Sequence, residues 1–199
     1  MKRRFFPWVV LVASLVGGFV ACARSEHDRA NPQRPALSEA SGPMVIDPVL
    51  LAFLSKARAA HHSADAAEAS GNIDAAVAAL EGLARGPKPG GEHPPAEVSE
   101  VLSDTHARLA DLQSARGQFD AANTHVRQGL ELAATVTYFR GHLFEVQGLV
   151  EERRAKSLEQ QGETEKAKEA RKAAITAFDE AVRVQDQVIL NALGDAGPH

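Results

Sequence analysis

The pattern of hydrophobic and polar positions divides the chain into an uncharged opening segment, a polar stretch without periodicity and a long region of helical spacing. Residues 5–21 form a 17-residue run without a charged side chain. Residues 23–47 show no repeated spacing, whereas from Pro48 onward apolar residues recur every three or four positions. Because an α-helix repeats every 3.6 residues, this spacing predicts a helical domain over 48–193. Residues 194–199 are expected to be a disordered tail.

Proline and glycine set the expected helix boundaries. Residues 86–95 contain four prolines and three glycines, and no helix crosses such a segment. After Pro95 there is no proline until Pro198, which favours long helices. We expect six helices, at 48–70, 72–85, 95–116, 119–135, 137–161 and 164–192.

The last expected helix is the longest of the six. Its predicted packing face consists of Ala167, Ala174, Phe178, Ala181, Val184 and Val188. Such a helix either caps a stack with an ordinary solvated outer face or pairs with another helix.

Three segments between expected helices share one local pattern. Each has a glycine, an apolar or threonine residue two positions later and an alanine five positions later. The copies are Gly71, Ile73 and Ala76; Gly117, Phe119 and Ala122; and Gly162, Thr164 and Ala167, with the glycines 46 and 45 residues apart. Glycine permits the left-handed corner between antiparallel helices, and alanine permits a close helix approach. The pattern therefore predicts three helix pairs.

This pattern resembles the turn of the tetratricopeptide repeat, which reads Gly-x-aromatic-x-x-Ala. The resemblance extends over roughly residues 57–180 and includes a small residue seven positions before each glycine: Ala64, Ala110 and Ala155. The period exceeds the family's 34 residues by about three helical turns, which predicts lengthened first helices. The resemblance implies an all-α fold of three antiparallel helix pairs stacked as a short solenoid. A closed helical bundle is the alternative.

The resemblance also implies that the first helix of each pair lines a groove that binds a partner. The matching positions are Arg58, His61, Asp65, Glu68, Asp104, Ala107, Asp111, Ser114, Glu152, Lys156 and Glu159. This surface is mixed in charge and rich in acids, which suits a basic or polar peptide segment. A solvated helix face is the alternative interpretation.

The opening segment has the organisation of a bacterial export signal. Three basic residues precede the apolar run, and Ala21 followed by Cys22, the single cysteine, ends it. This resembles the lipobox of bacterial lipoproteins, which implies removal of the signal peptide 1–21 and acylation of Cys22. Two alternatives stay open: secretory cleavage after Ala23, which releases a soluble periplasmic protein, and an uncut membrane-spanning segment.

Processing before Cys22 changes the charge and leaves a tether. Nineteen basic residues then face 26 acidic ones, a net charge of −7, and an acidic domain without a basic stripe is a poor nucleic-acid binder. Residues 22–47 become a lipidated cysteine and a flexible linker that spans on the order of 25–30 Å. By resemblance to lipoproteins, Ala23 permits sorting to the outer membrane. We therefore expect a lipid-anchored protein of the cell envelope that faces the periplasm.

The sequence offers no catalytic motif. It lacks Gly-x-Ser-x-Gly, and a single cysteine excludes haem attachment through Cys-x-x-Cys-His. No two histidines are four residues apart and no acid precedes a helical histidine by three, so the usual helical zinc and di-iron motifs are absent. His61 with Asp65 and His142 with Glu145 are the available pairs, and solvated surface residues are the simpler interpretation. We expect no enzyme activity, cofactor or metal.

The expected function is a membrane-anchored helical-repeat scaffold that binds another envelope protein or a peptide segment of one. The alternative is a periplasmic helical bundle that binds a ligand or metal through His61, His106, His125 or His142.

Overall fold

The computed structural model describes residues 47–195, and these contain six α-helices and no strand. The helices are α1 (Pro48–Ala69), α2 (Ile73–Ala84), α3 (Ala96–Ala115), α4 (Phe119–Leu132), α5 (Tyr138–Gln160) and α6 (Thr164–Asp195). All six belong to one compact unit, Val45–His199. The predicted all-α fold is confirmed.

The predicted signal peptide, Cys22 and the tether up to residue 46 lie outside the described residues, as do residues 196–199 of the expected tail. Over residues 47–195, no helix combines the length and the apolar character needed to cross a lipid bilayer.

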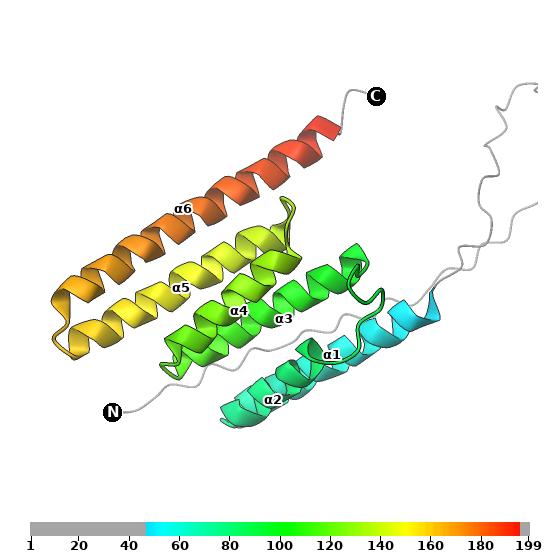
Figure 1. Ribbon diagram of the computed structural model, residues 1–199, viewed down its shortest axis with the longest axis horizontal. Helices are drawn as coiled ribbons and strands as arrows, with labels where there is room; N and C mark the ends of the chain where they lie inside the picture. The colour runs from blue at the N-terminus through cyan, green and yellow to red at the C-terminus, as the bar shows by residue number, and fades with distance from the viewer. Residues whose placement is uncertain (1–46, 196–199) are drawn as a thin grey trace, which may run out of the picture. The chain divides into compact units, whose positions relative to one another are not determined.

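The helices pack as three antiparallel pairs that follow one another in chain order (Figure 1). α1 pairs with α2, α3 with α4, and α5 with α6. The first helices also contact each other in sequence, since α3 touches α1 and α5 touches α3. Within the described part of the chain, α1 and α2 make no contact with α5 or α6. A closed bundle would bring the first and last pairs together, so the pairs form an open, solenoid-type stack.

The same glycine turn joins the two helices of every pair. Gly71, Gly117 and Gly162 have φ angles of 76°, 74° and 79°. In each turn the glycine N–H donates to the carbonyl three residues back, and the next N–H donates to the carbonyl five residues back. These bonds satisfy carbonyls that the helix end leaves without a partner, and the left-handed conformation they need favours glycine.

Small residues on both sides of each turn let the paired helices approach closely. Six alanines of the repeated pattern are buried: Ala64, Ala110 and Ala155 before the glycines, and Ala76, Ala122 and Ala167 after them. The residue two positions after the glycine is half-buried at Ile73 and Phe119 but exposed at Thr164. The third turn therefore lacks the apolar cover of the first two.

The hydrophobic core lies between consecutive pairs. One cluster joins α1, α2 and α3 around Leu80 and Leu109, and another joins α3, α4 and α5 around Val126 and Leu143. A third cluster, which includes Phe53 and Leu102, joins the other ends of α1, α2 and α3. Because each cluster draws on two neighbouring pairs, no pair buries its apolar face alone.

Two predicted helix ends are wrong, and the others agree within one residue. The helix expected at 119–135 ends at Leu132. There the Arg140 guanidinium of α5 donates to the carbonyl of Ala133 at 2.9 Å, while the Thr137 hydroxyl accepts the first-turn N–H of Arg140 at 3.3 Å. The helix expected to end at 192 continues to Asp195.

Candidate functional site

The face formed by the first helices is held together by an arginine of α3. The Arg108 guanidinium reaches across to α1, where it donates to Asp65 Oδ1 at 2.5 Å and to the carboxylate of Glu68. It also donates to the carbonyl of His61 at 3.5 Å. One side chain therefore satisfies three acceptors on the neighbouring first helix.

An arginine of α5 makes the equivalent contact to α3. Arg153 Nη1 donates to Asp111 Oδ1 at 2.6 Å and to Ser114 Oγ at 2.5 Å. We call these two contacts the arginine clamps. In the first, Arg108 binds Asp65 and Glu68; in the second, Arg153 binds Asp111 and Ser114. Bonds from a guanidinium to a carboxylate are stronger than neutral hydrogen bonds, so the clamps fix successive first helices side by side.

The structure uses several of the predicted groove residues in contacts between helices. Four of them accept hydrogen bonds from the clamp arginines: Asp65, Glu68, Asp111 and Ser114. A fifth, Glu159, forms an ion pair with Arg171 of α6 at 2.5 Å. His61 Nε2 lies 3.0 Å from the Thr105 hydroxyl of α3, which itself donates to the carbonyl of Val101. Ala107 is buried and Asp104 half-buried.

Three predicted groove residues of α1 and α5 have exposed side chains. Arg58, Glu152 and Lys156 are exposed, and within residues 47–195 none of them pairs with a side chain of another helix. We call these three residues the open positions. They present two positive charges and one negative charge to solvent from α1 and α5.

Sequence reasoning missed the two clamp arginines. Each clamp arginine stands nine residues before the turn glycine of its own helix pair: Arg108 before Gly117, and Arg153 before Gly162. The acceptors of each arginine stand six and three residues before the turn glycine of the preceding pair, which is Gly71 for Arg108 and Gly117 for Arg153. Alignment of the copies on their glycines would have shown the shared arginine, but not that it reaches the neighbouring helix.

A second feature is a cleft of about 560 Å³ between α2 and α4, with α3 at its base. His106 of α3 and His125 of α4 meet in it, and their Nδ1 atoms lie 3.2 Å apart. Glu81 of α2 and Lys88 of the following loop also line the cleft.

Burial lowers the pKa of the two cleft histidines and that of His61 on α1, which favours the neutral form of each at pH 7. Burial, and after it the His125 imidazole and the Lys88 ammonium group, lower the pKa of His106 to about 4. Burial also lowers the pKa of His125, against the opposing effect of Glu81, and the pKa of His61, against that of Asp104. In a neutral pair at this distance, one Nδ1–H donates to the other Nδ1.

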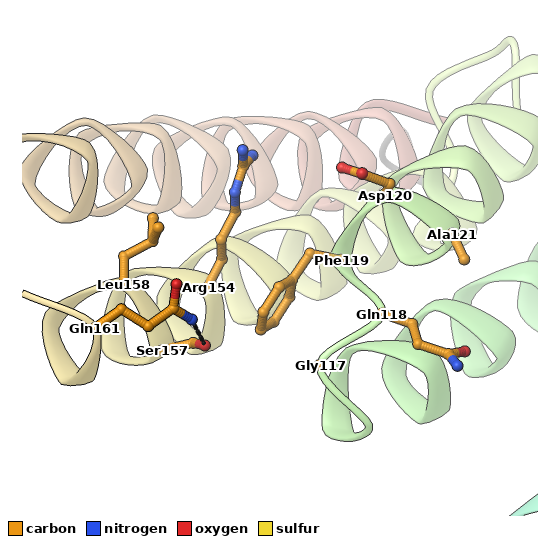
Figure 2. Close-up of a pocket in the computed structure, with 9 residues that line it drawn as sticks. All are labelled: Gly117, Gln118, Phe119, Asp120, Ala121, Arg154, Ser157, Leu158 and Gln161. Carbon is orange, nitrogen blue, oxygen red and sulfur yellow. Dashed lines mark hydrogen bonds between the residues drawn. The ribbon is translucent and has the colours of Figure 1, made fainter. Parts of the chain in front are cut away.

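A third feature is a cleft of about 480 Å³ beside the second glycine turn. Residues 117–121 form one wall, and Arg154, Ser157, Leu158 and Gln161 form the other. Figure 2 shows the Phe119 ring extending from the start of α4 toward α5, where Gln161 Nε2 donates to Ser157 Oγ at 3.1 Å. The cleft thus combines an aromatic ring with a guanidinium and amides.

The remaining histidine pair is a local one. His142 Nδ1 lies 3.2 Å from Glu145 Oε2 on the same helix, and its ring stacks on Tyr138 with centroids 6.0 Å apart. Over the described residues, no three histidine, cysteine or acidic side chains gather as ligands for one metal ion.

Comparison with known proteins yields no match to a family model, to a curated protein or to a solved structure.

Proposed function

We propose that the protein is a lipid-anchored scaffold of the cell envelope whose first-helix face, with a tetratricopeptide-like arrangement, binds another envelope protein. The observation that carries the proposal is the pair of arginine clamps. They hold α1, α3 and α5 side by side, so side chains from three helices keep fixed positions on one face. Fixed positions reduce the ordering cost of binding, which favours recognition of a partner.

The chemistry of this face suits a polar, extended segment. The carboxylates of Asp65 and Asp111 are more than 40% exposed although each holds a clamp arginine, so each retains acceptor capacity toward solvent. The open positions add charges of both signs beside them. A partner segment with basic or amide groups would find acceptors at regular intervals along the stack.

The argument for a membrane anchor rests on the sequence. An apolar signal that ends at Ala21-Cys22 supports acylation of Cys22, and the residues up to 47 supply a tether. A tether of about 25 residues spans on the order of 25–30 Å, so the helical domain would work close to the membrane surface.

A crosslinked pull-down from whole cell envelopes tests the proposal. The bait is the full-length chain with a C-terminal tag, compared with Cys22→Ala, with Glu152→Lys on the face and with Glu131→Lys as a matched control on α4. Glu131, like Glu152, is an exposed acidic residue. We expect a specific protein with the wild type and Glu131→Lys, less of it with Glu152→Lys and none with Cys22→Ala. Equal recovery with all four baits would contradict the proposal.

The histidine cleft supports a second candidate function, metal binding. Two nitrogens that bind one tetrahedral metal ion at roughly 2.0–2.1 Å lie about 3.3–3.4 Å apart, close to the 3.2 Å between His106 and His125. Because burial lowers the pKa of His106 to about 4, a metal ion at pH 7 would not have to displace the second ring proton of its imidazole. Calorimetry with Zn²⁺, Cu²⁺ and Ni²⁺ tests this function on the wild type, His106→Ala and the control His93→Ala. Stoichiometric binding lost only with His106→Ala would support it, and heats that are equal for all three proteins would exclude it.

A further inference from the structure

Most of the large apolar side chains that stay exposed lie at one end of the helical stack. Because the paired helices are antiparallel, the three glycine turns lie at one end. The start of α1, the α4–α5 connection and the end of α6 lie at the other end (Figure 1). Among the described residues, nine large apolar side chains are exposed, and seven belong to this second end: Val49, Leu51, Val136, Tyr138, Ile189, Leu190 and Leu193. We call these seven residues the apolar end.

Contacts between helices place these segments at the same end. Leu50 of α1 and Leu132 at the end of α4 pack against one core cluster. Gln185 Nε2 of α6 donates to the carbonyl of Tyr138 at the start of α5, at 3.2 Å. Because α6 has 32 residues and α5 has 23, α6 continues past this contact and carries Leu193 about 12 Å beyond Gln185.

The opposite end of the stack differs in its exposed residues. Over the described part of the chain, no exposed large apolar residue lies beside a glycine turn, since Ile73 and Phe119 are half-buried. The two exposed residues outside the apolar end, Ile175 and Val182, lie further back along α6. Single exposed aliphatic residues are ordinary, but a set drawn from three separate segments at one end marks a contact surface.

The chain that precedes α1 indicates what this surface contacts. Asp47 directly precedes α1, so residues 22–46 join the domain at the apolar end. With Cys22 acylated, about 25 residues separate the lipid from this end and span on the order of 25–30 Å. The opposite end lies farther from the anchor by the length of α1, roughly 30 Å. The lipid surface is therefore the apolar surface within reach of this end.

The side chains of the apolar end have the chemistry of a membrane interface. Leucine, isoleucine and valine enter the boundary between headgroups and acyl chains, and tyrosine lies there with its ring in the apolar layer and its hydroxyl in water. Acidic residues outnumber basic ones around this end, so attraction to anionic headgroups does not contribute. The exposed charges are Asp47, Glu92, Glu97 and Glu131 against Arg85 and Lys88.

We propose that the apolar end docks on the lipid surface in which Cys22 is anchored, so that the helices stand up from the membrane and the glycine turns point away from it. This inference rests on the lipid anchor of the proposed function and adds the orientation of the domain. The anchor holds the apolar end near the surface at a high effective concentration, so a few side chains suffice for docking. In this orientation α1, α3 and α5 remain accessible to a partner.

Quenching of a fluorescent label by nitroxide-labelled lipid tests the orientation. The full-length protein, extracted from membranes, is reconstituted in phosphatidylcholine vesicles with one introduced cysteine as the labelling site. Val136→Cys places the label at the apolar end, and Ser70→Cys places it on an exposed residue beside the first glycine turn. We expect strong quenching at position 136 and none at position 70. No quenching at either position, or equal quenching at both, would overturn the proposal.

A charge in the apolar end tests the contact itself. Leu190→Glu lies in the apolar end, and Ile175→Glu makes the same kind of change on an exposed residue about 20 Å further back on α6. Each is combined with Val136→Cys. We expect Leu190→Glu to lower the ratio of docked to undocked protein by about tenfold or more, and Ile175→Glu to leave it unchanged. Equal losses, or no loss with Leu190→Glu, would contradict docking through this end.

The chain without an introduced cysteine separates failure of docking from failure of the anchor. Acylation removes the Cys22 thiol, so this chain should take up no label. Uptake of label would contradict the proposed anchor and docking together. Absence of uptake, combined with an unquenched label at position 136, would overturn docking alone.

Discussion

Arg153 of α5 repeats, one helix pair further along the stack, the contact that Arg108 of α3 makes with α1. The two arginines stand 45 residues apart, and each donates to acceptors six and three residues before the preceding turn glycine. The repeated spacing of arginines and acceptors in the sequence therefore produces the same contact between two successive pairs of helices, α1 with α3 and α3 with α5. The same bond determines how the first helices line up.

Replacement of a clamp arginine should loosen the stack. For Arg108→Gln we expect a loss of about 1–2 kcal/mol in the free energy of unfolding, because two carboxylates lose a charged partner that is only 24% exposed. For Arg153→Gln we expect about 1 kcal/mol or less, since that pair is more exposed. Urea unfolding of the full-length protein measures both, with Arg127→Gln on α4 as the control. Losses no larger than that of Arg127→Gln would show that the clamps contribute nothing to stability.

Replacement by alanine should lower the free energy of unfolding at a turn glycine and raise it at a helical glycine. Gly117 has a φ of 74°, where an alanine Cβ is strained, so Gly117→Ala should lower the free energy of unfolding by about 1–2 kcal/mol. Gly82 lies in α2, and a Cβ there meets no atom within 4 Å, so Gly82→Ala should raise it by about 0.5–1 kcal/mol. Thermal or urea unfolding gives both values. The same sign for the two variants would contradict the assigned turn geometry.

The contact between α5 and α6 depends on the absence of a side chain at Gly148. A Cβ added there would lie 2.5 Å from the Phe178 ring, so Gly148→Ala should cost about 1–3 kcal/mol. Because the clash involves one ring, Gly148→Ala/Phe178→Leu should cost less than the sum of the two single changes. Additive costs in urea unfolding would place the strain elsewhere.

Stability should fall between pH 6.5 and pH 4. The pKa of His106 is about 4 in the folded protein and 6.5 when exposed, so over this range the unfolded chain binds a proton that the folded protein does not. Acidification therefore favours unfolding: the contribution of His106 is complete above pH 6.5 and lost by pH 4, up to about 3 kcal/mol. His61 and His125, whose pKa values are also lowered, act in the same direction.

A pair of variants separates His106 from other acid-sensitive groups. His106→Gln should flatten the dependence of the unfolding free energy on pH, while His93→Gln, in the exposed connection before α3, should leave it as in the wild type. Identical pH profiles for the wild type and His106→Gln would contradict the assignment.

The helices and turns were predictable because their signals are local. A glycine at 117 and an alanine at 122 specify a left-handed corner and a close approach within one turn of chain. The end of α4 was mispredicted for the opposite reason. Ala133 and Ala134 favour a helix, but Arg140 of the next helix takes the Ala133 carbonyl, and such a tertiary bond has no local pattern.

The candidate surfaces were predictable only in part. The acidic residues of the first-helix face follow from the repeat register, but their use as clamp ligands depends on which helices lie side by side. The meeting of His106 with His125, and the outward direction of Ile175 and Val182, likewise depend on how α4 and α6 are rotated in the stack.

The most direct test of the central claim, that the first-helix face binds an envelope partner, is photocrosslinking in intact cells. A photoreactive residue is placed at Arg58 and at Lys156, both open positions, and at Arg127 on α4. We predict one and the same crosslinked protein from Arg58 and Lys156 and none from Arg127. Crosslinks of equal strength from all three positions, or from Arg127 alone, would contradict it.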